Sequence, residues 1–299
     1  MSNSCGFSCS ILWRLLRPHT LTASFLPVLT GAALAWCHTR SLRIDLLLAM
    51  LAVAALLQTA TNIFNEYYDY LRGVDTVAST GIAGAITRDG LPPRLILRLA
   101  LGTMALAIVP GLYLCAECGW WLFAAGVLSA MAGYFYTGGP WPIAASPLGE
   151  LVSGGFMGGG IVLLACYVQM GRLQWIDAAI AFSFMLLIAS ILTANNIRDI
   201  EGDTAAGRHT LVILLGRERA IVFLAAMLFA AHGWIVLLVC LQKLPLWTLL
   251  SLGGVLPSVA AIRAFRRGRA LSAGMQAMRR VAQVNTVFGV LLIAGLLCG

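Results

Sequence analysis

The sequence predicts an all-α integral membrane protein, built as a bundle of nine transmembrane helices. Of its 299 residues, 60% are hydrophobic and only 11% are charged, whereas a soluble globular chain is about half apolar and a quarter charged. The apolar residues form continuous runs about as long as the roughly 20 residues that a helix needs to cross a bilayer. These runs lack the alternation of lipid-facing strands, which argues against an outer-membrane barrel. The composition also excludes the soluble, disordered and collagen-like classes.

Nine apolar stretches, each bounded by charged or turn residues, are the predicted spans. The first lies between Arg17 and Arg40, and the fourth ends at the Gly-Gly-Pro turn that begins at Gly138. The second and the sixth run into clusters of Asn and Asp residues. In chain order the predicted spans are 20–37, 44–64, 95–115, 120–137, 149–168, 176–194, 219–240, 244–262 and 282–298.

The basic residues predict how the bundle is oriented. With nine spans the two chain ends face opposite sides, and the side richer in Lys and Arg is cytoplasmic. Of the 20 basic residues, 16 fall on the side of the N-terminus and 4 on the other. We therefore expect a multi-pass protein of the cell inner (cytoplasmic) membrane with a cytoplasmic N-terminus and an external C-terminus. The net charge of +8 then reflects topology and contact with anionic lipid, so no nucleic-acid partner is expected. No obligatory protein partner is evident either.

The acidic residues gather at two helix ends. Nine of the 12 Asp and Glu lie on the predicted cytoplasmic side, and most of these nine belong to two clusters. The first cluster follows the second span and comprises Asn62, Asn65, Glu66, Asp69, Arg72 and Asp75. The second follows the sixth span and comprises Asn195, Asn196, Arg198, Asp199, Glu201 and Asp203, with Arg208 after it. This arrangement indicates a shared polar site at one end of the bundle.

The spacing within each cluster favours a metal site. If each helix continues through its cluster, residues four apart share a face, so Asn65 aligns with Asp69, and Asn195 aligns with Asp199 and Asp203. Like charges at this spacing repel each other unless a cation lies between them. Oxygen ligands of this kind suit Mg²⁺, which bridges carboxylates to phosphate oxygens. The clusters therefore predict Mg²⁺ as a cofactor and a diphosphate as a substrate.

The two clusters also indicate an internal duplication. Arg72 and Arg208 flank them and offer the planar, charged donors that phosphate recognition favours. The same order of Asn and Asp returns to the same membrane side four spans later, as expected if two halves of a bundle face a common cavity. We expect a single domain, 1–299, with two pseudo-repeated halves of about 1–140 and 141–299.

The chain resembles the UbiA superfamily of membrane prenyltransferases, most closely its 1,4-dihydroxy-2-naphthoate polyprenyltransferase branch. The resemblance runs nearly from end to end. Its motifs are Trp13 to Leu21 with Arg17-Pro18, Pro27 to Gly31, Asn65 to Asp69, Arg72 to Asp75, Gly81 to Gly90, Tyr136 to Ile143, Leu148 to Glu150, and Asn195 to Asp203.

The resemblance implies a UbiA-like bundle of nine helices with a cytoplasmic polar cap, and an active site that faces the cytoplasm. It implies that the catalytic and Mg²⁺-binding residues are Asp69, Asp75, Asp199 and Asp203, with Glu66 as an additional candidate ligand. The implied substrate-binding residues are Asn62, Asn65, Arg72, Asn195, Asn196, Arg198, Arg208, Tyr68, Tyr136 and Glu150. Two departures stand out, because Glu66 replaces the usual Asp of the first motif and His209 stands where the branch commonly has a basic residue.

The function that the resemblance implies is Mg²⁺-dependent prenyl transfer. A polyprenyl diphosphate would donate its polyprenyl group to the aromatic acid 1,4-dihydroxy-2-naphthoate, with release of diphosphate and CO₂, giving demethylmenaquinone in menaquinone biosynthesis. The bundle would shield the allylic cation from water, and ring faces such as those of Tyr68 and Tyr136 could stabilise it. The prenyl tail would lie along the apolar interior of the bundle and leave by the lipid side, and the lipid bilayer is an expected partner.

Two alternatives stay open at the level of sequence. The first is a UbiA-family prenyltransferase with another aromatic acceptor such as 4-hydroxybenzoate. In that branch the last acid of the first motif commonly falls eight residues after Asn65, where this chain has Gly73, whereas Asp75 follows two residues later. The second is a cation-coupled transporter, which predicts acids near mid-span rather than at helix ends. The prenyl chain length, the number of Mg²⁺ ions and the oligomeric state are not predicted.

Overall fold

The computed structural model describes residues 9–74, 84–268 and 271–299, and these residues contain helices and no strand. The prediction of an all-α fold is confirmed. The helices are α1 (Cys9–Leu16), α2 (Pro18–Thr39), α3 (Ile44–Leu71), α4 (Pro93–Leu106), α5 (Ile108–Cys118), α6 (Trp121–Thr137), η1 (Ile143–Ala145), α7 (Gly149–Ser153), η2 (Gly154–Gly160), α8 (Ile161–Met170), α9 (Trp175–Ala205), α10 (Leu211–Leu215), α11 (Arg217–Cys240), η3 (Leu246–Gly254), α12 (Val255–Arg267) and α13 (Leu271–Cys298).

The predicted number of nine spans is not confirmed. Within the described ranges, eight helices are long and apolar enough to cross a membrane. A ninth apolar helix, α6, matches the fourth predicted span but has only 17 residues. The eight longer ones are Thr20–Thr39, Ile44–Leu71, Pro93–Cys118, Gly149–Met170, Trp175–Ala205, Arg217–Cys240, Leu246–Arg267 and Ser272–Cys298.

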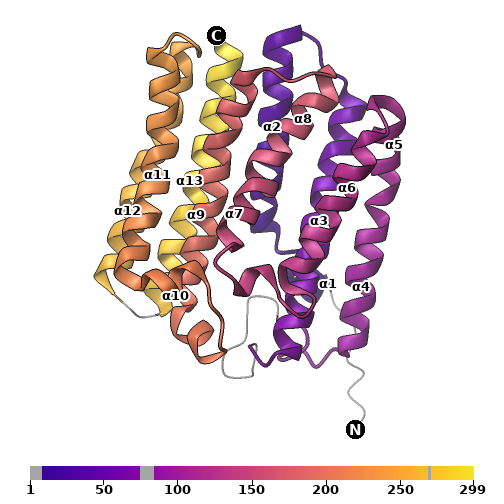
Figure 1. The fold of residues 1–299 in the computed structure, drawn as a ribbon, viewed down its shortest axis with the longest axis vertical. Helices are drawn as coiled ribbons and strands as arrows, with labels where there is room; N and C mark the ends of the chain where they lie inside the picture. Colours follow the sequence, from indigo (N-terminus) through magenta and orange to yellow (C-terminus); the bar gives the residue numbers. More distant parts are fainter. Residues whose placement is uncertain (1–8, 75–83, 269–270) are drawn as a thin grey trace.

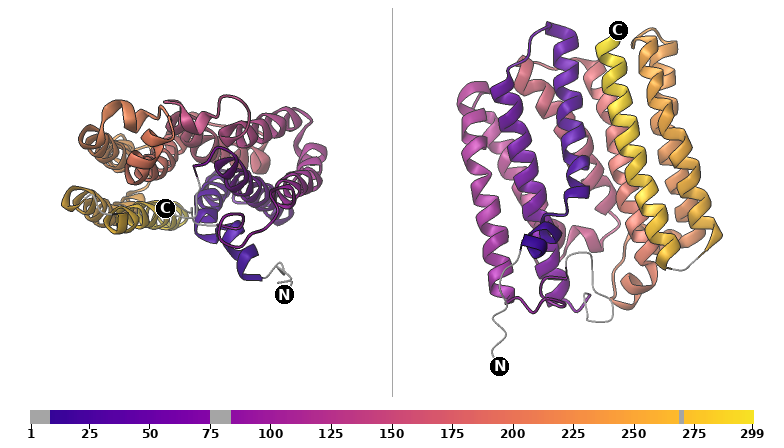
Figure 2. Two further views of the ribbon diagram at one scale, coloured as in Figure 1. Left: turned by 90° about the horizontal axis from the view of Figure 1, so that it is seen from below. Right: turned by 180° about the vertical axis from the view of Figure 1, so that it is seen from behind.

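The helices form two flanks around a central group. Figures 1 and 2 show α11 to α13 on one flank and α3 to α6 on the other, with α2 and α7 to α9 between them. Helix α2 packs on α3, α8 and α13, and α9 packs on η2, α11 and α13. Helix α1 and the C-terminal ends of α3 and α9 lie at one end of the bundle, and the C-terminus lies at the other (Figure 1).

Two spans are interrupted where the sequence breaks the α-helical hydrogen-bond pattern. Helices α4 and α5 meet at Ala107, because Pro110 has no backbone N–H to donate to the carbonyl of Leu106. The span that begins with α7 passes through the π-helical segment η2, whose sequence is Gly-Gly-Phe-Met-Gly-Gly-Gly. A Cβ atom at Gly158 would lie 2.5 Å from the carbonyl oxygen of Phe184 in α9. Glycine therefore allows η2 to pack directly against the α9 backbone.

This close approach gives a test of the packing. Gly158→Ala should lower the melting temperature of the protein in detergent by several degrees, since overpacking typically costs about 1–3 kcal/mol. Gly155→Ala is the matched control in the same segment, because a Cβ at Gly155 meets nothing within 4 Å. Equal melting temperatures for the two variants would contradict the direct contact of η2 with α9.

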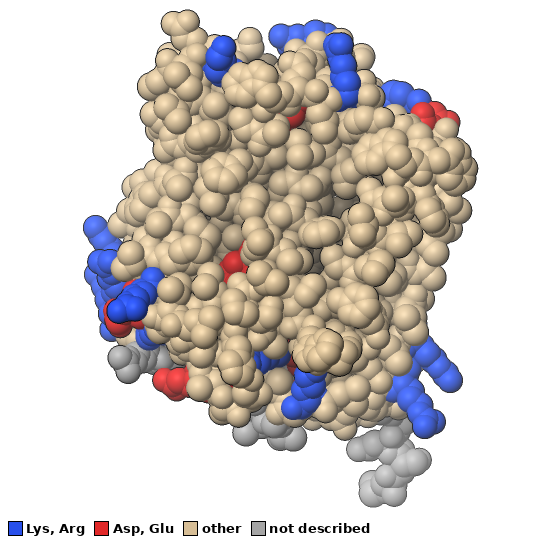
Figure 3. Space-filling model, in the orientation of Figure 1, with Lys and Arg blue, Asp and Glu red and all other residues tan. Residues whose placement is uncertain are grey.

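The surface is that of a multi-pass membrane protein. Figure 3 shows Lys and Arg gathered at the two ends of the molecule and a broad band of uncharged residues between them. The span Pro93–Cys118 is only 17% buried within the bundle over its most apolar window, although that span is strongly hydrophobic. An outward face of this kind is stable in lipid and not in water.

Candidate active site

A cavity of about 1220 Å³ lies inside the bundle, lined by residues of α2, α3, α5, α6, η2, α8, α9 and α13. Figure 3 shows the surface hollowed between α6 and α8, on the face seen in Figure 1. One end of the cavity is apolar, with Met50 of α3 and Val168 of α8 in its wall. The other end is polar and carries residues of both Asn and Asp clusters.

The polar end forms because α3 and α9 continue as helices through their clusters. Helix α3 runs to Leu71 and α9 runs to Ala205, so the condition under which residues four apart share a helix face is met. The cavity wall includes Asn65 and Asp69 from α3. It also includes Asn195, Asp199 and Asp203 from α9. The prediction that each cluster presents a stripe on one helix face is therefore confirmed.

Arg208 joins the two clusters. Its Nη2 donates to Oδ1 of Asp69 at 2.6 Å, and its Nη1 donates to Oδ1 of Asp203 at 3.1 Å. Asp69 belongs to α3 and Asp203 to α9, so one guanidinium group lies between carboxylates from helices that are far apart in the sequence. Charge-assisted bonds of this kind are stronger than neutral ones. In the structure the guanidinium of Arg208 therefore supplies the positive charge between the two carboxylates.

Next to this bridge, α9 presents a second ion pair and an amide. Arg198 donates through Nε to Oδ1 of Asp199 at 2.7 Å and through Nη2 to the other carboxylate oxygen. Its Nη1 donates to Sδ of Met278 at 2.8 Å. The Oδ1 atom of Asn195 is buried and has no hydrogen-bond partner among the described residues. Because Asn195 lines the cavity, this oxygen is available to a ligand.

A chain of polar side chains extends from the clusters into the cavity. Asn62 donates to Oγ1 of Thr20 at 3.0 Å, and Gln58 donates to Oδ1 of Asn62 at 3.2 Å. All three line the cavity. Asn65 accepts from Oγ1 of Thr137 at 2.8 Å, which ties α3 to the end of α6. Polar side chains within a membrane span are costly and commonly mark a functional site.

Arg72 and Tyr68 do not lie in the cavity wall as the structure has it. Arg72 donates to the backbone carbonyls of Thr137 and Gly139, the latter at 2.8 Å, so it holds the end of α6 against α3. The hydroxyls of Tyr68 and Tyr134 are 2.8 Å apart, so Tyr68 also faces α6. Of the two predicted tyrosines, Tyr136 lines the cavity. A role for Arg72 in phosphate binding stays a prediction.

Two buried glutamates hold segments in place beside the cavity. Glu66 is 2% exposed and accepts from the backbone N–H groups of Gly84 and Ile86 at 3.2 and 3.3 Å. These bonds fix the segment that leads into α4. Glu66 was predicted only as a candidate metal ligand, and the structure shows that it also has a structural role. Glu150 is 3% exposed and accepts from Nδ2 of Asn196 at 2.9 Å, which joins α7 to α9.

Sequence reasoning did not assign Arg17 or Arg88 to the site, although both line the cavity. Arg17 precedes α2 with a φ of 47°, an uncommon conformation for a residue with a side chain. Residues in this conformation cluster at functional sites. The Arg17-Pro18 pair is the sequence feature that could have identified Arg17 as a site residue. Asp75, a predicted catalytic and metal-binding residue, lies outside the described residues.

The predicted metal ligands are not assembled into a coordination shell. No group of three or more His, Cys, Asp or Glu side chains that could hold a metal ion occurs in residues 9–74, 84–268 and 271–299. Asp69 and Asp203 are bonded to Arg208, and Asp199 is bonded to Arg198. Arginine therefore supplies the countercharge at this site in the structure.

Comparisons with known proteins identify what the chain is similar to. The model of the UbiA prenyltransferase family matches residues 24–283. The 1,4-dihydroxy-2-naphthoate octaprenyltransferase of Bacillus subtilis (strain 168) is 45% identical over 289 residues, which cover 96% of this chain and 92% of that protein. The apo structure of a UbiA homologue from Aeropyrum pernix K1 has a TM-score of 0.68 at 19% identity and covers 91% of this chain and 97% of its own. A UbiA homologue from Archaeoglobus fulgidus bound to GPP and Mg²⁺ has a TM-score of 0.65 at 16% identity and covers 94% of this chain and 99% of its own.

Proposed function

The chain belongs to the UbiA prenyltransferase family, and from this premise we propose that it transfers a polyprenyl group from an allylic polyprenyl diphosphate to 1,4-dihydroxy-2-naphthoate. The observation that carries the proposal is the cavity, whose polar end has Arg208 between Asp69 and Asp203 and whose other end is apolar. A diphosphate fits the polar end of the cavity, and a prenyl tail fits the apolar end. The similarity to the Bacillus subtilis protein supports the choice of acceptor and a place in menaquinone biosynthesis.

The residues at the polar end fit Mg²⁺. The oxygen donors in the cavity wall are the carboxylates of Asp69, Asp199 and Asp203, which pair with Arg208 and Arg198 in the structure, and the amide oxygen of Asn195. They are hard oxygen ligands of the kind that Mg²⁺ prefers. We propose that these residues, together with Asp75, hold the ion. When bound, Mg²⁺ would neutralise charge on the leaving diphosphate.

The chain's own arginines would bind and orient the donor. Arg208, Arg198 and Arg17 line the polar end and can donate to diphosphate oxygens. The bond between the allylic carbon and the diphosphate oxygen breaks, and its electron pair leaves with the diphosphate. The walls of the cavity keep water from the allylic cation, and the ring of Tyr136 in that wall can stabilise it.

The acceptor would lie beside the diphosphate site, against the end of the polar chain that carries Asn62 and Thr20, because the carbon that it attacks is bonded to a diphosphate oxygen. Its electron-rich ring attacks the allylic carbon, forming the new carbon–carbon bond. Loss of the ring carboxylate as CO₂ restores aromaticity, so no strong base is required. This assignment agrees with the fact that the described cavity wall offers amides and hydroxyls there and no His or Lys.

The orientation and the internal symmetry are also proposals. We propose that the polar end faces the cytoplasm in the inner membrane, with the N-terminus on the same side and the C-terminus outside, since most of the basic residues lie at that end. We also propose one domain with two pseudo-repeated halves, since α3 and α9 supply matching Asn and Asp residues to one cavity.

The test is a transfer assay with purified protein in lipid nanodiscs. The protein is incubated with geranylgeranyl diphosphate, Mg²⁺ and either 1,4-dihydroxy-2-naphthoate or 4-hydroxybenzoate, and prenylated products are measured by mass spectrometry. We expect a prenylated, decarboxylated product from the naphthoate and loss of product with EDTA. Product from 4-hydroxybenzoate alone would contradict the proposed acceptor, and a product that persists in EDTA would contradict the proposed cofactor.

A further inference from the structure

The turn formed by residues 84–91 brings one arginine to the wall of the cavity. It begins at Gly84, whose φ of 58° is a left-handed conformation that favours glycine, and it leads into α4. The backbone N–H of Arg88 donates to the carbonyl of Gly84 at 2.9 Å, which closes the turn. Of residues 84–91, the cavity wall includes only Arg88. The position of the turn therefore decides where Arg88 lies relative to the cavity.

The carboxylate of Glu66 holds this turn against α3. Its Oε2 accepts from the backbone N–H of Gly84 at 3.2 Å, and its Oε1 accepts from that of Ile86 at 3.3 Å. The Glu66 side chain is only 2% exposed, so water does not compete for these bonds. Ala85 and Ile86 are also buried in one hydrophobic cluster with Phe64 of α3. Polar and apolar contacts therefore fix the turn on the same helix.

The turn is held level with the polar end of the cavity. Glu66 follows Asn65 and lies three residues before Asp69 on α3, a rise of about 4.5 Å. Asn65 and Asp69 line the cavity, whereas Glu66 is absent from the described residues of its wall. Both carboxylate oxygens of Glu66 already accept from backbone N–H groups. These contacts favour a role in holding the turn over a role as a metal ligand.

The same carboxylate lies near a second arginine of the cavity wall. The Nη2 of Arg17 is 3.9 Å from the Oε2 of Glu66, and Arg17 also lines the cavity. This separation is longer than a hydrogen bond. The attraction is therefore weaker than the two bonds that Glu66 makes to the turn, and Glu66 acts mainly on the turn.

A further ion pair anchors the other side of the turn. Arg14 of α1 donates to the carboxylate of Asp89, the residue after Arg88. Arg88 therefore lies between two anchors, one from α3 and one from α1. Its own side chain is exposed, so the guanidinium is accessible to a ligand at the polar end of the cavity.

We propose that Arg88 binds the diphosphate of the donor and that Glu66 is the positioning residue that holds Arg88 there. A guanidinium presents planar pairs of N–H donors that match phosphate oxygens. Glu66 acts through the backbone of the turn and does not touch the donor. This assignment rests on the proposed function, since it adds a binding residue and its support to the same diphosphate site.

The test is a double-mutant cycle on the KM for geranylgeranyl diphosphate in nanodiscs. Arg88→Met should raise this KM by about tenfold or more, the effect of losing one charge-assisted hydrogen bond, with kcat nearly unchanged. Glu66→Gln should raise it by about five- to tenfold, because the glutamine NH₂ group cannot accept from a backbone N–H. In the Arg88→Met background, Glu66→Gln should change KM by less than about twofold, since both substitutions then act on one contact. Effects that multiply independently would overturn the assignment of Glu66.

Glu66→Asp separates charge from reach. Aspartate is shorter by one methylene, about 1.5 Å, so the bonds of 3.2 and 3.3 Å to the turn are lost while the negative charge stays. The KM for the donor should rise as in Glu66→Gln. At saturating donor, the Mg²⁺ concentration for half-maximal activity should keep its wild-type value in both variants. A rise of that concentration in Glu66→Gln would show that Glu66 is a metal ligand and would overturn the positioning role.

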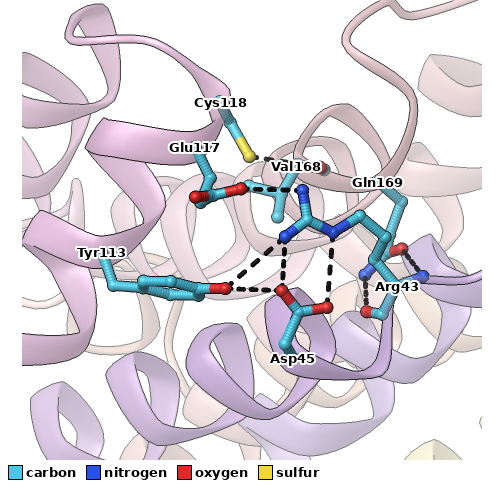
Figure 4. Close-up of polar contacts among 7 residues, drawn as sticks. All are labelled: Arg43, Asp45, Tyr113, Glu117, Cys118, Val168 and Gln169. Atoms are coloured by element: carbon cyan, nitrogen blue, oxygen red, sulfur yellow. Dashed lines mark hydrogen bonds and ion pairs between the residues drawn. The ribbon is translucent and has the colours of Figure 1, made fainter.

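The matched controls change similar residues outside the site. Arg43, which precedes α3 at the other end of the bundle, donates to Glu117 of α5 at 2.8 Å (Figure 4). Neither residue occurs among the described residues that line the cavity. Glu117→Gln should therefore leave the donor KM unchanged, although it also removes a glutamate that joins two helices. Arg94→Met, at an exposed position in the first turn of α4, is the control for Arg88→Met and should also leave KM unchanged.

Isothermal titration with inorganic pyrophosphate and MgCl₂ measures binding without transfer. The Kd of pyrophosphate should rise by about tenfold in Arg88→Met, which is expected to fold because Arg88 is exposed. Equal affinity in wild type and Arg88→Met would overturn the assignment of Arg88. If wild type transfers no prenyl group while its affinity for pyrophosphate still depends on Arg88 and Glu66, the proposed function fails and the diphosphate contact stands. Melting temperatures are measured in parallel for every variant.

Discussion

Asp203→Asn should lower kcat for prenyl transfer by about 100- to 1000-fold, the usual effect of removing one group that stabilises transition-state charge. Asp203 is buried, lines the cavity and accepts from Arg208 at 3.1 Å. Asparagine has the same shape but no charge, so the site loses an anionic ligand for Mg²⁺ while the fold is kept. The Mg²⁺ concentration for half-maximal activity should rise together with the loss of kcat. Asp69→Asn should likewise lower kcat and raise the Mg²⁺ concentration for half-maximal activity, because Asp69 contacts the same guanidinium.

The matched control neutralises an acid at the same end of the bundle but outside the cavity. Glu218 is exposed at the start of α11, and Glu218→Gln should leave kcat and the Mg²⁺ dependence unchanged. The comparison is made by steady-state assays on folded protein, with melting temperatures measured in parallel. Wild-type Mg²⁺ dependence in Asp203→Asn would contradict the assignment of Asp203 as a ligand.

Arg208→Met should reduce kcat/KM for the donor by about 1000-fold, because the proposed donation from the guanidinium to the diphosphate is lost and each charge-assisted bond is worth about 1.5–3 kcal/mol. The same substitution should strengthen Mg²⁺ binding in the absence of donor. Asp69 and Asp203 then lose the guanidinium that lies between them, and a divalent cation is the remaining countercharge. Isothermal titration with MgCl₂ measures this second effect.

Arg208→Lys separates charge from geometry. Lysine keeps the positive charge but cannot present a planar fork to two carboxylates, so we expect a loss of activity between those of wild type and Arg208→Met, with little change in Mg²⁺ affinity. Weaker Mg²⁺ binding in Arg208→Met would show that Arg208 positions the carboxylates and does not compete with the ion.

Much of this site was predictable because it depends on local helical periodicity. The spacing of Asn195, Asp199 and Asp203 places them on one face of any continuous helix, and α9 does continue to Ala205. The same reasoning holds for Asn65 and Asp69 on α3. The apolar runs likewise predicted most spans to within a few residues of their bounds, apart from the longer ends of α3, α9 and α13.

The remaining features depend on packing between helices. The carbonyls that hold Arg72 belong to the end of α6, and no pattern near Arg72 indicates that they lie within reach. Glu66 is held by backbone N–H groups about twenty residues later in the chain. Arg17 enters the cavity because α1 and α2 meet at a left-handed residue. Pro110 is a sequence signal for the break between α4 and α5. Helix α6 has only 17 residues, so the described residues contain eight long spans and not the predicted nine.

We propose that the two clusters form one diphosphate site. The most direct measurement is a structure of the protein in nanodiscs with Mn²⁺ and a prenyl thiodiphosphate, an analogue that resists cleavage. We expect the diphosphate within hydrogen-bond distance of Arg208, metal density against Asp69 and Asp203, and the tail directed toward Met50. A diphosphate bound elsewhere, or metal held by residues of one cluster alone, would contradict it.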